Sequence, residues 1–186
     1  MRHPFEALRA DKRRPIFLSL VALTLIVMGV LNVTGGPLKT PAAPQGIVSF
    51  ELAGDGPSAQ AILDCWDCQA RAHAGFNLGF DFVFMLLYSS AIGLACVWVA
   101  CVLPSRYRPL AAVGLTLAWG QWLAALLDVV ENVALLVILL DSPVAPWPQV
   151  ALWCAVPKFA LVFLGLGYVA LGSVVRLVGS HRPGSE

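Results

Sequence analysis

The chain has 186 residues, of which 59% are hydrophobic and only 12% are charged, and its mean hydropathy is +0.79. Because soluble domains carry about a quarter of charged residues, this composition excludes an ordinary soluble domain and indicates a protein whose solvent is lipid. The formal net charge is +1, and the sequence lacks the basic patch that nucleic acid requires, so we expect no nucleic-acid partner.

Four apolar stretches predict the fold, and they cover residues 16–33, 76–102, 110–140 and 147–178. Each is long enough to cross a hydrocarbon core about 30 Å thick. The first stretch follows basic residues, as a signal peptide would, but its apolar run is longer than usual and no small-residue cleavage site follows directly, so we expect it to be retained. The sequence therefore predicts an all-α integral membrane four-helix bundle that forms a single membrane domain over residues 1–186.

Lysine and arginine residues predict the orientation, because they are enriched in cytoplasmic loops. The predicted extracytoplasmic side holds only Lys39 and Arg71, in the loop formed by residues 34–75. We therefore expect both termini to be cytoplasmic. The basic residues on the side of the termini are Arg2, Arg9, Lys12, Arg13, Arg14, Arg106, Arg108, Arg176 and Arg182.

The extracytoplasmic loop divides into three parts. Residues 34–46 are rich in glycine and proline, which predicts an irregular linker. Residues 47–53 alternate apolar and polar side chains, which predicts a short extended segment on the rim of the bundle. A short amphipathic helix is expected to follow, with Ser58 as its N-cap and Trp66 as its anchor in the membrane interface.

Polar side chains inside the last three apolar stretches recur at helical spacing, so that each helix carries one polar stripe. Three such stripes are expected to face one another inside the bundle. At about 1.5 Å per residue, Asp128, Glu131 and Lys158 lie at similar depth, and Asp81 lies nearer the outer mouth. The stripes consist of Asn77, Asp81 and Tyr88, then Gln121, Asp128, Glu131 and Asn132, then Cys154, Lys158, Gly165 and Tyr168.

The charges in these stripes point to an interior site, because a carboxylate near the middle of a spanning helix costs at least about 2.5 kcal/mol. Three carboxylates against one lysine leave a net charge of −2 if all four groups are ionised. We therefore expect a bound proton, a cation or cationic ligand, or entering water. A structural ion pair between Lys158 and Asp128 or Glu131, which only sets the helix register, is the alternative. The predicted ligand or proton site comprises Asp128, Glu131, Asn132 and Lys158, with Asp81 and Tyr88 at its entrance.

Cys65 and Cys68 form a C-x-x-C motif in the predicted outer loop. Such motifs support thiol–disulfide exchange, but an incidental pair or a small local disulfide has the same spacing. Only His73 lies nearby as a further metal ligand, so we expect no metal site. The remaining cysteines lie in the apolar stretches and are expected to pack as small apolar side chains: Cys96, Cys101 and Cys154.

Several short motifs resemble those of a group of bacterial four-span membrane proteins of unknown function. The motifs are F-E-L-A-G at residues 50–54, D-F-x-F-x-x-x-Y at 81–88, D-x-x-E-N at 128–132 and K-F-A at 158–160. This resemblance covers most of the chain. It implies a location in a bacterial inner (cytoplasmic) membrane, and it implies no particular activity.

A second resemblance concerns the thiols. C-x-x-C just before the second apolar stretch, with Arg71 close behind, is similar to the disulfide bond formation protein B family of quinone-linked thiol oxidases. The resemblance implies that Cys65 and Cys68 are a redox pair, that quinone is the cofactor and that Arg71 lies near the quinone. That family carries a second cysteine pair in its second outer loop, whereas the corresponding DSPVAPW segment at residues 141–147 contains no cysteine.

Three functional hypotheses follow. The preferred one is a multi-pass membrane protein whose buried ionisable site binds or moves a small molecule, lipid, proton or cation without a cofactor. The first alternative is a membrane thiol–disulfide oxidoreductase that uses Cys65 and Cys68. The second is an accessory subunit of a larger membrane complex, in which the polar stripes bind a helix of another protein.

Overall fold

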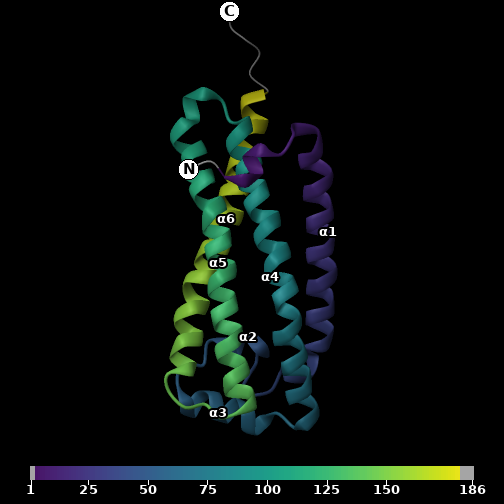
Figure 1. Ribbon diagram of the computed structural model, residues 1–186, viewed down its shortest axis with the longest axis vertical. Helices are drawn as coiled ribbons and strands as arrows, with labels where there is room; N and C mark the ends of the chain where they lie inside the picture. Colours follow the sequence, from purple (N-terminus) through teal and green to yellow (C-terminus); the bar gives the residue numbers. More distant parts are fainter. Residues whose placement is uncertain (1–2, 181–186) are drawn as a thin grey trace, which may run out of the picture.

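Four long helices form most of the protein, and their order and directions are visible in the computed structural model (Figure 1). The structure describes residues 3–180, so Arg2 and Arg182 lie outside the described residues. Within that range four helices are long and apolar enough to cross a membrane, which confirms the predicted all-α fold with four candidate spans. These helices are α1 (Ala10–Thr34), α4 (Cys68–Val102), α5 (Arg108–Leu140) and α6 (Trp147–Ser180).

The helices α4, α5 and α6 pack on one another, whereas α1 packs mainly along α4 (Figure 1). Small residues let the backbones of the three core helices approach closely. A Cβ atom on Gly165 of α6 would lie 2.5 Å from Nε2 of Gln121 and 2.8 Å from Cγ2 of Ile92. In α1, by contrast, only Val27 is buried. The fold is therefore a three-helix core with a fourth helix at its side.

Short helices close the end of the bundle that lies opposite both termini (Figure 1). We call residues 36–66 the cap; it contains η2 (Gly36–Leu38), α2 (Ile47–Glu51) and α3 (Gly56–Cys65). The α2 helix packs against α5 and α6. The apolar residues of the cap are buried together with parts of α4, α5 and α6 in one core. This core includes Leu38, Phe50, Ile62, Trp66, Leu135 and Ile138.

Two predictions about the cap are wrong. Residues 47–53 do not form an extended segment, because Ile47, Phe50 and Glu51 share one side of the short α2 helix and that side packs into the bundle. The N-cap of α3 is Asp55 rather than Ser58, since the Asp55 carboxylate accepts a hydrogen bond of 2.7 Å from the backbone N–H of Ser58. Local pattern alone did not distinguish these possibilities.

Trp66 is also placed differently from the prediction. It is buried in the cap instead of anchoring a helix in the membrane interface. Its indole Nε1 donates a hydrogen bond of 3.0 Å to the backbone oxygen of Leu38, and its ring lies 5.1 Å from the ring of Phe50. The guanidinium of Arg71 donates to the backbone oxygens of Leu63 and Trp66, which satisfies the carbonyl end of α3. Trp66 and Arg71 therefore join the cap to the start of α4.

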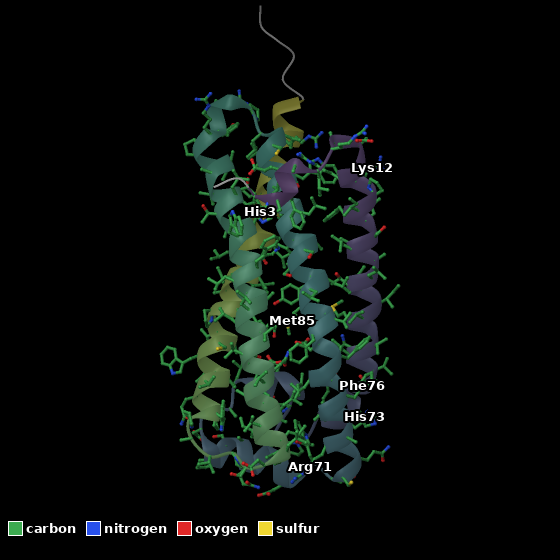
Figure 2. All side chains as sticks on the ribbon, viewed as in Figure 1. His3, Lys12, Arg71, His73, Phe76 and Met85 are labelled. Carbon is green, nitrogen blue, oxygen red and sulfur yellow. The ribbon has the colours of Figure 1, made fainter. Side chains whose placement is uncertain are left out.

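The opposite end of the bundle, which we call the basic end, holds both termini and the connection between α4 and α5 (Figure 1). The N-terminal segment contains η1 (Pro4–Ala7), which packs on α4, while His3 reaches α5 (Figure 2). The buried His3 ring lies 4.9 Å from the ring of Trp119 and 5.0 Å from that of Trp122. This aromatic contact fastens the segment to the bundle.

A pH effect is expected at His3. Burial lowers the pKa of His3, and the nearby Glu6 carboxylate opposes this shift more weakly. The folded state therefore favours neutral imidazole, so docking of the segment is fully stable above the unfolded pKa of about 6.5 and weakens as the pH falls below it. Hydrogen exchange of residues 3–8, corrected for intrinsic rates, should increase between about pH 7 and pH 5. The increase should disappear in His3→Gln, and the same response in both proteins would contradict the assignment.

Candidate functional site

Lys158 of α6 lies at the centre of the site. Its Nζ atom is 2.8 Å from Oε1 of Glu131 and 3.0 Å from Oδ1 of Asp128, both on α5. The exposed fractions are 5% for Lys158, 2% for Asp128 and 0% for Glu131. The sequence prediction that the stripes of α5 and α6 face one another at the same depth is therefore confirmed by these contacts.

Two further contacts bring the stripe of α4 into the site. The Tyr88 hydroxyl donates a hydrogen bond of 2.8 Å to Oδ2 of Asp128. The Asn132 side-chain amide donates one of 2.6 Å to Oδ2 of the half-buried Asp81. Asp128 and Glu131 thus contact Lys158 directly, and Tyr88 is connected to it through Asp128. Asn132 and Asp81 form a separate pair that lines the same cavity.

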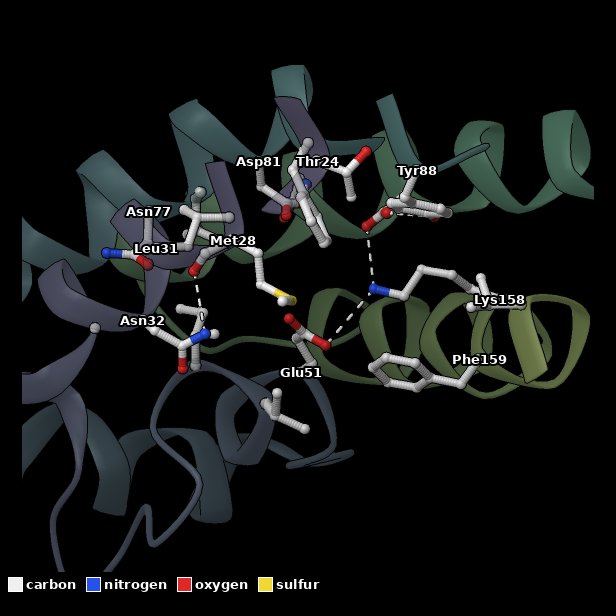
Figure 3. Close-up of a pocket in the computed structure, with 18 of the residues that line it drawn as sticks. Thr24, Met28, Leu31, Asn32, Glu51, Asn77, Asp81, Tyr88, Lys158 and Phe159 are labelled. Atoms are coloured by element: carbon white, nitrogen blue, oxygen red, sulfur yellow. Dashed lines mark hydrogen bonds and ion pairs between the residues drawn. The ribbon is translucent and has the colours of Figure 1, made fainter. Parts of the chain in front are cut away.

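Glu51 belongs to the same site, and sequence reasoning missed it. Its Oε2 atom lies 3.6 Å from Nζ of Lys158, as the close-up in Figure 3 shows. The residue comes from α2 and reaches into the bundle from its capped end. The signal was present in the helical spacing of Ile47, Phe50 and Glu51, but an extended reading of this segment places Phe50 and Glu51 on opposite faces. We call Glu51, Asp81, Asp128 and Glu131 the acidic cluster.

The acidic cluster has more negative charge than Lys158 can balance. Among the described residues at the site, four carboxylates and one ammonium sum to −3 if all are ionised. Burial raises the pKa of Glu51, and the ammonium of Lys158 opposes that shift. Buried charges that remain unpaired are strongly unfavourable, so the site must take up protons or a positively charged group. The buried Oε2 atom of Glu51 accepts no hydrogen bond and lies 3.6 Å from Nζ of Lys158.

A cavity of about 660 Å³ adjoins the acidic cluster. Its wall includes Glu51, Asp81, Asp128 and Lys158, whereas Glu131 does not line it. Most of the remaining wall is apolar and comes from α1, α4 and α6 (Figure 3). Sites for small molecules usually have this size and combine an apolar wall with a few polar groups. The arrangement can therefore hold a molecule that has both a cationic or proton-donating group and an apolar part.

The first helix contributes to the wall but not to the acidic cluster. Thr24 and Asn32 of α1 line the cavity (Figure 3). The Thr24 hydroxyl donates to the oxygen of Leu20, and the Asn32 amide donates to the oxygen of Met28, both within α1. The Thr24 hydroxyl and one N–H of the Asn32 amide are therefore bonded within the helix, and most of the surface that α1 presents to the cavity is apolar.

Other members of the polar stripes lie outside the site. Nε2 of Gln121 donates a hydrogen bond of 2.8 Å to the backbone oxygen of Leu161, and this bond joins α5 to α6. The buried Tyr168 hydroxyl has no hydrogen-bond partner, and it packs against Gly114. These contacts lie towards the basic end of the bundle and connect the core helices to one another.

The two tyrosines allow a matched test of the site. Tyr88→Phe should lower the free energy of unfolding by about 1.5–3 kcal/mol, because it removes a hydrogen bond to a carboxylate. Tyr168→Phe removes a hydroxyl that makes no hydrogen bond, so it should change stability little or even increase it. Unfolding in detergent, followed by circular dichroism, measures both variants. Equal losses in the two would show that the hydroxyl of Tyr88 contributes nothing specific.

The cysteines of the C-x-x-C motif lie at the capped end, away from the acidic cluster. Cys65 ends α3 and Cys68 begins α4, and both are exposed free thiols. Asp67, between them, caps α4 by accepting a hydrogen bond of 2.7 Å from the N–H of Ala70. This N-cap interaction of Asp67 explains why α4 begins at Cys68, whereas the apolar stretch begins only at residue 76. Cys96 is buried and Cys154 is half-buried, as expected for apolar packing, but Cys101 is exposed.

The chain matches no family model, no curated protein and no solved structure. The function must therefore be inferred from the site itself.

Proposed function

We propose that this multi-pass membrane protein binds a small molecule or lipid with a cationic or proton-donating group in the cavity, where the acidic cluster holds that group. The proposal rests on one observation: three carboxylates of the acidic cluster contact Lys158, and the fourth, Asp81, lines the same 660 Å³ cavity, whose wall is mostly apolar. We further propose that the protein lies in a bacterial inner membrane with both termini in the cytoplasm.

The members of the cluster have different roles in this proposal. Lys158 is held between Asp128 and Glu131, and its charge compensates part of theirs. Glu51 and Asp81 face the cavity and retain acceptor capacity for the ligand. A cationic group that enters the cluster replaces protons held by the carboxyl groups, so binding is expected to release protons. Coupling of this kind is what a protein that moves a cation or proton needs.

Native mass spectrometry of the protein, released from its own membrane, tests the proposal. The wild type should retain a bound small molecule, and Glu51→Gln should retain about tenfold less of it, which corresponds to about 1.4 kcal/mol. Asp81→Asn should act in the same direction. Asp141→Asn, at an exposed carboxylate between α5 and α6, is the matched control and should behave as the wild type.

Other results would count against this function. An empty wild-type monomer would contradict it. Equal retention by the wild type and by both cluster variants would place the ligand elsewhere. If a second membrane protein co-purified with this protein and no small molecule was bound, the accessory-subunit hypothesis would be favoured.

A second candidate function is thiol oxidation, which is favoured by the exposure of Cys65 and Cys68 on adjacent helix ends. Oxidation of the two thiols to a disulfide releases two electrons and two protons, and a quinone in the membrane is the proposed acceptor. A trapped mixed disulfide between this protein and a partner would support the candidate. Full function of Cys65→Ser in a cell-based assay would eliminate it.

A further inference from the structure

We propose that the ligand is a single-chain amphiphile with a cationic head group, and that it enters from the lipid between α1 and α6 and keeps its hydrocarbon chain there. This inference rests on the proposed function and adds the chemical class of the ligand and its route of entry.

The side of the molecule between α1 and α6 is open to the hydrocarbon. The α1 helix packs mainly along α4 (Figure 1), and residues of both α1 and α6 line the cavity (Figure 3). Residues of both helices line the cavity and are exposed at the same time: Leu25 is 55% exposed, Met28 40% and Leu166 48%. Wall residues that stay this exposed indicate that the cavity is not enclosed between these two helices. A molecule dissolved in the bilayer can therefore reach the cavity without crossing the cap.

The cavity has a polar part and a long apolar part. Along α1 its wall extends from Gly35 to Val21, which is about 20 Å at 1.5 Å per residue, or roughly two thirds of a 30 Å hydrocarbon core. Most polar residues of the wall lie between the cap and Lys158. Towards the basic end the wall is mostly apolar and includes Val21, Leu25, Ile92, Val162 and Leu166; Thr24 is its polar member, and its hydroxyl donates within α1. An extended hydrocarbon chain fits this apolar part, whereas an inorganic cation would leave it empty.

The charge of the site selects the head group. The four carboxylates, Lys158 and the exposed Lys39, which also lines the cavity, sum to −2 if all are ionised. An anionic head would add to this negative charge, whereas an ammonium group would compensate it. Aromatic rings of Phe84, Tyr88 and Phe159 also line the cavity, and Nζ of Lys158 lies 4.6 Å from the ring centroid of Phe159. Aromatic walls favour ammonium groups through cation–π attraction. Charge and lining therefore both favour an amine or quaternary ammonium over a phosphate or sulfate.

Photolabelling tests the position of the chain. The probe is dodecylammonium with a diazirine at the end of its tail, added to the full-length protein in phosphatidylcholine nanodiscs. We expect adducts on residues 21–28 of α1 and 162–166 of α6, and we expect excess unlabelled dodecylammonium to suppress them. Glu51→Gln and Asp81→Asn should each reduce these adducts about tenfold, while Asp141→Asn should not. The corresponding dodecyl sulfate probe should give only adducts that excess unlabelled dodecylammonium does not suppress.

The possible outcomes separate this inference from the proposed function. Competed, cluster-dependent adducts confined to the cap would overturn the inference and leave the proposed function intact. Suppression of labelling by butylammonium as effectively as by dodecylammonium would likewise show that the chain contributes nothing. Equal labelling by the sulfate probe would overturn the cationic head group. If the ammonium probe gave no competed adducts while native mass spectrometry detected a bound molecule, the ligand would be of another class.

Discussion

Lys158→Met is expected to lower the free energy of unfolding by about 3–5 kcal/mol, because it leaves buried carboxylates without their counter-ion. In the wild type the ammonium lies 2.8 Å from Glu131 and 3.0 Å from Asp128, and both carboxylates are almost wholly buried. Methionine has a similar length and no charge, so the change removes the ion pair with little loss of volume. Thermal or denaturant unfolding in detergent measures the effect.

Two comparisons isolate the charge at Lys158. Lys12→Met removes an exposed lysine at the start of α1 and should change stability by less than about 0.5 kcal/mol. Adding Glu131→Gln to Lys158→Met should recover part of the lost stability, since it removes one of the unpaired carboxylates. If Lys158→Met unfolded at the same midpoint as the wild type, the result would contradict this expectation. It would show that the carboxyl groups are neutral when the lysine is absent.

Trp66→Ala is expected to have an effect of similar size, about 3–5 kcal/mol, on the stability of the cap. The indole is buried among the side chains of the cap, and its Nε1 holds the backbone oxygen of Leu38 at 3.0 Å. Its removal leaves a large cavity and an unpaired carbonyl. Because α2 belongs to the cap, the change should also release Glu51 from Lys158. Hydrogen exchange of residues 36–66 is the measurement, and it should rise while exchange in α5 remains slow.

Graded and exposed controls identify the cause of that effect. Trp66→Phe keeps most of the buried ring and loses the hydrogen bond, so the expected loss is smaller, about 0.5–1.5 kcal/mol for the bond together with a packing loss. Trp153→Ala removes an exposed tryptophan on α6 and should leave the cap unchanged. If Trp66→Ala exchanged no faster than Trp153→Ala in residues 36–66, the cap would not depend on the indole.

A purely structural ion pair does not account for the whole site. Such a pair explains the contacts of Lys158 with Asp128 and Glu131, which fix α5 against α6. It does not explain why two more carboxylates, Glu51 and Asp81, line the adjoining cavity. Added carboxylates that only increase the uncompensated charge would be unfavourable in a dry structural site. Their presence favours a site that takes up a positively charged group.

Much of the site could be predicted because the signals are local. The length of each apolar stretch predicts a span, and helical spacing places Asp128, Glu131 and Asn132 on one side of α5. Hydrocarbon does not solvate charge, so such residues must face the interior, where Lys158 is the available counter-ion. These constraints act within single helices, and therefore the sequence alone could predict the four spans and the ion pairs of Lys158 with Asp128 and Glu131.

Only the tertiary structure decided which other segments contact the polar side chains of α5 and α6. Glu51 joins Lys158 because the cap folds back over the bundle, and the short 47–53 segment has too few residues for its periodicity to show whether it is helical. Trp66 is buried because Leu38 and Phe50 come to it from elsewhere in the cap. The cavity exists because α1 packs along α4 and stays apart from α6. Each of these features depends on contacts between residues distant in the chain, and local pattern carries no information about such contacts.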